Sequence, residues 1–374
     1  MNGRTGGLYK KRPFLSPLNQ RRWRNFKANR RGWWSLWAFL CLCLFSFSAE
    51  LISNDRPIIA SYKGELLFPV FFNYPDEKFG GKLASAYFRD PYIQDEIEKH
   101  GWAIWPLIRY SYNTPSENTR ALTPPFWLQG RAERCALYPG GAADPNCRFA
   151  NWNLLGTDDQ TRDIFARVLY GFRVSIAFTL VLTFFSAVIG IAAGAVQGYS
   201  GGWVDLLFQR FIEIWSSVPT LYLLIIMAAV FAQGFWVLLV IMLLFQWVVL
   251  VGVVRAEFLR ARNFEYVNAA RALGVPNHTI MIRHLLPNAM VAAITYLPFL
   301  LTAGISMLTS LDFLGFGLPP GSASLGELMR QATNNLTAPW IGITGFVTIA
   351  LMLSLLAFIG EAARDAFDPG KTFQ

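Results

Sequence analysis

The chain has little charge for its length of 374 residues. Asp, Glu, Lys and Arg make up 15% of it and hydrophobic residues 53%, whereas soluble domains carry about 25% charge. The sequence therefore predicts an integral membrane protein. Its three histidines, at positions 100, 278 and 284, show no HExxH spacing and no clustering with other metal-binding residue types. A membrane metalloenzyme is therefore not supported.

Nucleotide-hydrolysing motifs are also missing. "GKT" occurs at 370–372, but a phosphate-binding loop needs a Gly five residues before it and a helix after it. Asp365 stands at the first of these positions, and only Phe373 and Gln374 follow the triplet. We therefore expect no catalytic site, no metal and no bound cofactor in this chain.

Long apolar runs are the main feature that is present. A bilayer requires about 20 apolar residues per helix. Pro298 interrupts one of the runs, which membrane helices tolerate because neighbouring groups satisfy the freed carbonyl. The sequence predicts an all-α polytopic fold with six transmembrane helices, at 33–53, 170–197, 214–232, 235–254, 288–311 and 340–360.

Basic residues are concentrated at the N-terminus. Residues 1–31 contain ten Lys and Arg and no Asp or Glu. Such a stretch directly before a span favours a cytoplasmic location over nucleic-acid binding. The apolar run is too long for a cleaved signal peptide, although "SFSA" at 46–49 resembles a cleavage site. We expect a basic cytoplasmic tail at 1–32, a retained helix at 33–53 and two cytoplasmic termini.

This orientation places 54–165 outside the cytoplasm and the loop 255–287 inside it. The loop agrees, since it contains five Arg and two Glu. The outer segment is too long for a passive connection, and we predict a loop-rich α+β insert. Cys135 and Cys147 flank a turn-rich stretch in it, and a disulfide is favoured over two free thiols in an oxidising compartment. The remainder, 166–374, is predicted to be a five-helix core.

Small residues recur on one helix face. Gly190, Gly194 and Gly198 are four residues apart, a spacing that lets another helix backbone approach closely. We interpret this strip as helix packing. No Asp, Glu or Lys lies near the middle of a predicted span, so the charge relay of proton-coupled transporters is not visible.

The stretch "NAARALGVPNHTIMIRHLLP" at 268–287 is polar and sharply punctuated. It predicts a short helix that ends in a left-handed cap at Gly274, before Pro276. Asn277 is expected to begin a second helix that runs until Pro287 turns the chain. Ala269, Ala270 and Gly274 would offer a low-relief face for another protein. An amphipathic helix lying on lipid head groups is an equal alternative from the residues alone.

The same stretch resembles the EAA loop of ABC-importer permeases, whose pattern is E-A-A-x3-G-x9-I-x-L-P. Ala269, Ala270, Gly274 and the pair Leu286–Pro287 match it, while Asn268 stands in place of Glu and His284 in place of Ile. In that family the loop forms a coupling helix that docks into the ATPase. The resemblance implies docking by Asn268, Ala269, Ala270, Arg271 and Gly274, with Arg262 and Arg283 as flanking contacts.

Other segments resemble the dipeptide and oligopeptide branch of the family. They are "LGTDDQTRDIFARVLYGFRVS" at 155–175, "LDFLGFG" at 311–317, "APW" at 338–340 and "RDAFDP" at 364–369. Thr161 stands where the first pattern has Gly. With the large insert, the chain is most similar to the second permease subunit of microcin C-type oligopeptide importers.

The resemblance implies a location in the bacterial inner membrane and a peptide-like substrate. It also implies three protein partners: a homologous second permease, ATPase subunits that bind ATP and Mg²⁺, and a periplasmic peptide-binding protein. The alternatives from other classes are a self-contained channel or secondary transporter, which would need no ATPase, and a purely structural membrane scaffold.

Overall fold

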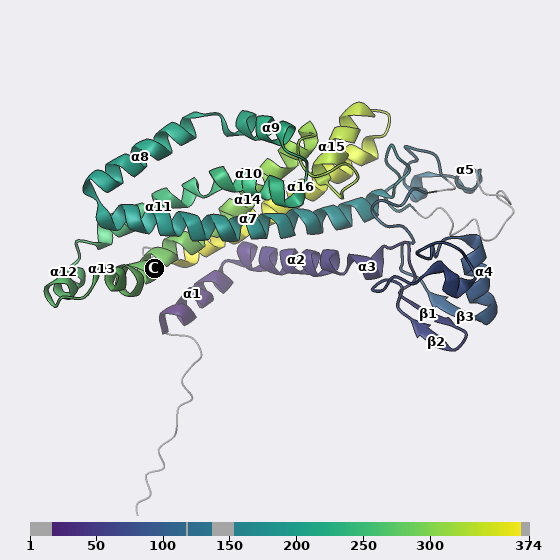
Figure 1. The fold of residues 1–374 in the computed structure, drawn as a ribbon, viewed down its shortest axis with the longest axis horizontal. Coiled ribbons are helices and arrows are strands. Elements are labelled where there is room, and N and C mark those ends of the chain that lie inside the picture. Colours follow the sequence, from purple (N-terminus) through teal and green to yellow (C-terminus); the bar gives the residue numbers. More distant parts are fainter. Residues whose placement is uncertain (1–16, 117–118, 137–152, 368–374) are drawn as a thin grey trace, which may run out of the picture.

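The computed structural model describes residues 17–116, 119–136 and 153–367. Long helices form an elongated bundle, and a small α+β unit lies at one end of it (Figure 1). The principal helices are α2 (Arg30–Phe47), α7 (Ile164–Ser200), α10 (Phe235–Gln246), α11 (Val248–Ala261), α14 (Leu286–Leu314) and α16 (Pro339–Phe367). The closest partners in the bundle are α7 with α11, and α16 with α2 and α14.

Four helical stretches among the described residues are long and apolar enough to cross a membrane. They are Ile164–Ser200, Phe235–Ala261, Asn277–Leu314 and Pro339–Phe367. These stretches contain the spans predicted at 170–197, 235–254, 288–311 and 340–360. The helix α14 continues through Pro298, and Thr302 Oγ1 donates a hydrogen bond to the Pro298 carbonyl at 2.9 Å.

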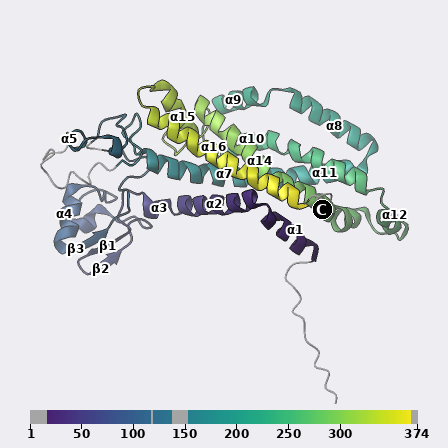
Figure 2. The same ribbon diagram turned by 180° about the vertical axis from the view of Figure 1, so that it is seen from behind.

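The span predicted at 214–232 is not one straight helix. It falls on α8 (Gly202–Ser217) and α9 (Thr220–Val230), which are bent by 73° relative to each other. Pro219 lies at the break, and a proline disfavours helical geometry in the residue before it. Counted as one bent span, this pair raises the number of candidate spans to five. The helix α8 arches away from the rest of the bundle in both views (Figures 1 and 2).

The helix α2 covers most of the predicted first span. It is not among the stretches that are both long enough and apolar enough to cross a membrane. Its 18 residues include Arg30 and Arg31, which lower its mean hydropathy. A sixth span therefore remains a prediction. Before α2, the basic helix α1 (Pro17–Ala28) turns outward at the end of the bundle opposite to the α+β unit (Figure 2).

The α+β unit contains an antiparallel sheet in the order β2–β1–β3, formed by Glu65–Leu67, Ile59–Tyr62 and Gly101–Ile104. Ala60 pairs with Leu67 on one side and Ala103 on the other. Positive φ at Lys63 and Gly64 makes the tight turn between the first two strands. The helix α4 (Pro91–His100) covers the sheet through Ile93 and Ile97.

Short elements complete the description. They are α3 (Ala49–Ile52), η1 (Asp76–Phe79), η2 (Phe126–Leu128), α5 (Arg131–Arg134), α12 (Glu265–Ala272), α13 (Asn277–Thr279), η4 (Ile280–Leu285) and α15 (Leu325–Asn334). Cys135 ends α5, is buried and is in a disulfide bond. Its predicted partner Cys147 lies outside the described residues, so that pairing remains a prediction. Cys41 and Cys43 in α2 are free thiols.

Candidate docking site at the 255–287 loop

The loop after α11 contains the short helix α12, and one face of this helix packs against the helical bundle. Val267 in α12 is fully buried and Ala270 nearly so, in a cluster with Phe258, Ile280 and Leu285. These contacts fix one face of α12 against the bundle. The opposite face is solvent-exposed, and it includes Asn268, Ala269 and Arg271.

The two alanines of the motif therefore have different surroundings. Ala269 is on the exposed face of α12, whereas Ala270 packs into the core of the chain itself. The expected low-relief face of Ala269, Ala270 and Gly274 is divided as a result. Adjacent helical residues point about 100° apart, so one of them lies against the bundle when the other faces outward.

Gly274 ends α12 in the left-handed conformation, as predicted, with φ of +78°. The Val275 N–H donates to the Ala270 carbonyl at 3.1 Å and the Gly274 N–H to the Arg271 carbonyl at 2.9 Å. This arrangement satisfies carbonyls that would otherwise be unpaired at the helix end. A Cβ at position 274 would meet open space, so the left-handed φ, and not crowding, favours Gly there.

The end of α7 braces the loop. The Arg271 guanidinium lies 5.2 Å from the centre of the Tyr199 ring, and Tyr199 Oη donates a hydrogen bond to Asn277 Oδ1 at 2.6 Å. Asn288 Nδ2 donates to Tyr266 Oη at 3.2 Å. A motion of α12 would therefore be transmitted to the ends of α7 and α14.

Large apolar side chains remain uncovered on this loop. Leu273 is 83% exposed, and the neighbouring rings of Phe264 and Tyr266 are about two-fifths exposed each. Exposed apolar groups near polar ones are typical of an interaction surface. Figure 1 shows α12, beside these residues in the chain, at a tip of the molecule.

The two predicted flanking residues differ in their environment. Arg262 packs its guanidinium against Gly201, in the turn between α7 and α8, and Arg283 is exposed on η4. The second helix also differs from the prediction. Pro287 does not turn the chain, because α13, η4 and α14 form one continuous helical stretch over Asn277–Leu314. Pro287 lies in the first turn of α14, directly after the π-helical turn of η4, and a proline is tolerated in a first helical turn.

The first turn of α8 forms a bidentate ion pair with α11. Arg255 Nε and Nη2 donate to Asp205 Oδ1 and Oδ2 at 2.5 and 2.7 Å. Arg210, by contrast, pairs with Glu213 on the exposed side of α8. The first pair joins the start of α8 to α11, directly beside the loop that leads into α12.

The glycine strip of α7 lies against α11. A Cβ at Gly190 would come within 2.6 Å of the Trp247 carbonyl oxygen, one at Gly194 within 2.8 Å of the Val251 oxygen, and one at Gly198 within 2.6 Å of the Phe258 Cβ. Contacts this close leave no room for any side chain. The two helices therefore approach backbone to backbone.

A second polar site combines three residues of the 155–175 segment with one residue of α15. Asp158, Arg162, Arg167 and Glu327 meet where α7 begins, and both arginines are almost completely buried. Arg167 donates to Asp158 at 3.2 Å and to Glu327 at 2.8 Å, and Arg162 donates to the same two residues at 2.7 and 3.3 Å. We name these four residues the ion cluster.

The ion cluster balances two positive against two negative charges. Burial alone would raise the pKa of Glu327, but Arg167 and Arg162 outweigh it and lower that pKa below its ordinary value. Asp158 and Arg162 are four residues apart in the turn before α7, so their ion pair is local in the sequence. Nothing in the sequence linked either of them to Glu327, which is 165 residues from Arg162.

Asp312 organises the loop that contains "LDFLGFG". Its Oδ1 accepts from the Leu318 N–H at 2.7 Å and its Oδ2 from Ser324 Oγ at 2.6 Å. Ser324 in turn caps α15 by accepting from the Glu327 N–H at 3.1 Å. The segments 155–175 and 311–317 thus both contact α15 or its N-cap.

A bundle of membrane-length helices with an exposed short helix between two of them defines a polytopic membrane protein. Residues 186–372 match the family described as binding-protein-dependent transport system inner membrane component. Residues 16–69 match the N-terminal TM domain of oligopeptide transport permease C. The chain belongs to this family of inner-membrane permeases.

Relatives resemble the chain over almost its whole length. It is 64% identical to the peptidoglycan transport system permease protein YejE of Agrobacterium fabrum, over 97% of this chain and 96% of that protein. It is 52% identical to the inner membrane ABC transporter permease protein YejE of Escherichia coli, over 96% and 98%. A solved structure of the MetNI methionine ABC transporter is also similar, with 19% identity, a TM-score of 0.46 and coverage of 54% of this chain and 96% of that one.

Proposed function

We propose that the chain is a permease subunit of an ATP-driven importer for oligopeptides or peptide-like compounds. The observation that carries the mechanism is α12, a helix fixed on one face by its own core and open on the other, with Leu273 uncovered. A partner ATPase would bind ATP and Mg²⁺ and dock on this open face. Its closure would move α12 and, through Tyr199 and Asn288, the ends of α7 and α14.

Two further elements belong to this proposal. The N- and C-termini and α12 would lie in the cytoplasm, with α2 as a first span and the α+β unit in the periplasm. There the unit would meet a peptide-binding protein or the paired, homologous permease. The many basic residues before α2 and in the 255–287 loop support this orientation.

Two cargo classes follow from the resemblances. The motifs are most similar to microcin C-type oligopeptide importers, and one close relative is named for peptidoglycan transport. Linear peptides and peptidoglycan-derived peptides share an amide backbone and charged ends, so one path can be proposed for both. Uptake of labelled members of each class, in competition, would separate them.

The docking proposal is tested by Leu273→Asp. Leu273 is 83% exposed, so the change leaves the fold of the chain intact but places a charge in an apolar contact. We expect loss of the ATPase from the purified complex and of peptide uptake, by roughly a factor of 10 or more. Gly274→Trp is a poorer probe, because the left-handed φ at that position would strain α12 itself.

A matched control is available at the other end of the molecule. Leu336 is 84% exposed between α15 and α16, so Leu336→Asp makes the same chemical change away from α12. Its complex should retain the ATPase. If Leu273→Asp also retains the ATPase and full uptake, α12 is not the docking helix, and a helix lying on lipid head groups is the better interpretation.

A further inference from the structure

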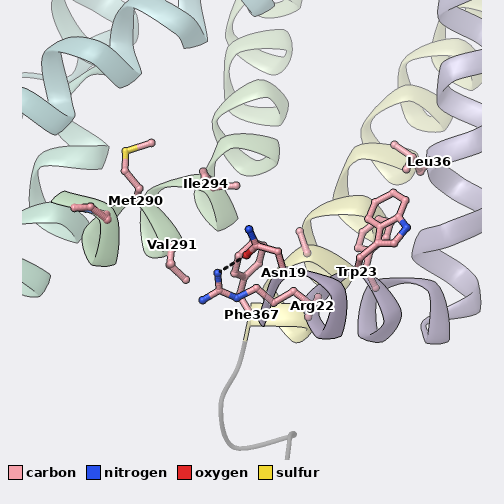
Figure 3. A pocket seen from close by; sticks show the side chains of 12 residues that line it. Asn19, Arg22, Trp23, Leu36, Met290, Val291, Ile294 and Phe367 are labelled. Atoms are coloured by element: carbon pink, nitrogen blue, oxygen red, sulfur yellow. Dashed lines mark hydrogen bonds between the residues drawn. The ribbon is translucent and has the colours of Figure 1, made fainter. Parts of the chain in front are cut away.

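An open groove lies beside α1, at the end of the bundle opposite to the α+β unit. It encloses about 500 Å³ between α1, the start of α14 and the end of α16. Figure 3 shows Met290, Val291 and Ile294 of α14 on one side, with Arg22 and Trp23 of α1 facing them across the gap. Side chains of the described residues leave this space unfilled.

The groove is apolar inside and polar at one edge. Ala363, Ala366 and Phe367 of α16 and Leu36 of α2 add further apolar surface. Arg22 and Asn19 are the polar residues in the lining, and Arg22 Nη1 donates to Asn19 Oδ1 at 3.3 Å. The Arg22 guanidinium also lies 4.7 Å from the centre of the Phe367 ring, so two contacts hold it in place.

The position of the groove matches the membrane boundary. Its walls come from the first turns of α14 and the last turn of α16, the ends of two membrane-length helices. Trp23 is partly exposed there, and Trp is enriched at the level of lipid head groups. A ligand in the groove would therefore have an acyl chain among apolar side chains and a head group beside α1.

Charge selects among the lipids. Residues 17–31 carry six basic side chains and no acidic one, at positions 21, 22, 24, 27, 30 and 31. The last turns of α16 carry Glu361, Arg364 and Asp365, a net charge of −1. The surroundings are strongly positive in sum. A guanidinium has five N–H donors in a planar fork that suits phosphate, and one hydrogen bond to Asn19 leaves others for a ligand.

We propose that this groove binds one anionic phospholipid, with its phosphate on Arg22 and an acyl chain against Val291 and Ile294. The lipid would join α1 to α14 and α16 and so fix the basic segment at the membrane surface. The proposal concerns lipid binding alone and does not depend on the transported substrate.

The test uses the full-length chain, purified from membranes with the subunits that accompany it. Native mass spectrometry would compare phosphatidylglycerol with phosphatidylcholine of the same acyl chains. We expect retention of phosphatidylglycerol and an affinity for it that falls roughly tenfold in Arg22→Gln, as for loss of a charged hydrogen bond. Ile294→Trp should also reduce binding, because the larger ring occupies the groove.

Matched variants separate a site from general attraction. Arg24→Gln removes the same charge from the same helix, at an exposed position that does not line the groove, and should bind nearly as the parent does. Val249→Trp is the control for Ile294→Trp, because it adds the same ring at an exposed position of α11 that does not line the groove. Melting curves of all variants establish that each is folded.

Three outcomes would overturn the proposal. Equal losses in Arg22→Gln and Arg24→Gln would indicate unspecific attraction to a basic surface. Equal affinity for phosphatidylcholine would remove the role of charge. Unchanged binding in a folded Ile294→Trp variant would show that the lipid sits elsewhere, or that another subunit fills the groove.

Discussion

At the scale of the residue, Thr161 has a backbone conformation that suits glycine. Its φ is +62°, in the left-handed region, which costs an L-residue with a Cβ roughly 1–2 kcal/mol. The turn is held by hydrogen bonds from Thr161 N–H to the Asp158 carbonyl and from Ser116 N–H to the Thr161 carbonyl. The geometry thus persists although the related permeases are expected to have Gly here.

Thr161→Gly should therefore stabilise the protein. We expect the free energy of unfolding to rise by about 1 kcal/mol, measured by thermal unfolding in detergent with tryptophan fluorescence. Thr161→Ala is the control, since it removes the hydroxyl and keeps the Cβ. Stabilisation by both changes would attribute the effect to the hydroxyl and contradict the backbone argument.

Asp163 is a second single residue whose ionisation affects the stability of the fold. It caps α7 by accepting from the Ala166 N–H at 2.9 Å, and it is fully buried, with no hydrogen-bond partner for Oδ2 among the described residues. Burial raises its pKa to about 7. The folded state therefore favours the protonated form, so ionisation lowers the free energy of unfolding as pH rises from about 4 to about 7.

Asp163→Asn should remove this pH dependence. The amide oxygen can still cap α7, and the side chain stays neutral at every pH. We expect the variant to melt at a higher temperature than the parent at pH 8 and at a similar one at about pH 4 or below. A variant less stable at pH 8 would mean that the charged carboxylate supports the fold.

At the scale of the element, the contact between α7 and α11 depends on the glycine strip. Gly194→Val would place methyl groups where a Cβ already lies 2.8 Å from the Val251 carbonyl oxygen. Forcing the helices apart should cost about 1–3 kcal/mol, seen as a lower melting temperature. Gly252→Val in α11 is the control, because a Cβ there meets open space. Equal melting of the two variants would contradict the packing role of the strip.

At the scale of the whole molecule, the ion cluster joins segments far apart in the sequence. Arg167 holds both Asp158 and Glu327, so Arg167→Met would leave two carboxylates buried beside one arginine. We expect destabilisation of about 3–5 kcal/mol, measured by thermal unfolding. Arg167→Lys should recover part of it, because a single ammonium cannot reproduce the fork of the guanidinium.

A small loss in Arg167→Met would show that water reaches the cluster and screens it. The double variant Arg167→Met with Asp158→Asn tests the same point from the other side. It removes one charge of each sign, so it should be more stable than Arg167→Met alone. If charge balance matters more than lost packing volume, the double variant melts above Arg167→Met and below the parent.

Local composition and spacing determined much about this protein from sequence alone. The low charge and long apolar runs indicated a membrane protein, and four of the predicted spans coincide with membrane-length helices. The left-handed end of α12 at Gly274 followed from one glycine and a nearby proline. These features depend on interactions between residues that are close in the chain, so the sequence is sufficient to predict them.

Tertiary structure alone decided which surfaces face inward. It buried Ala270 while exposing Ala269, bent α8 against α9 and brought Glu327 to Arg162 and Arg167. Helix periodicity states which residues share a face but not what that face meets. Contacts between segments more than 100 residues apart depend on how all the helices pack, because each helix satisfies its own backbone and leaves its position to side-chain fit.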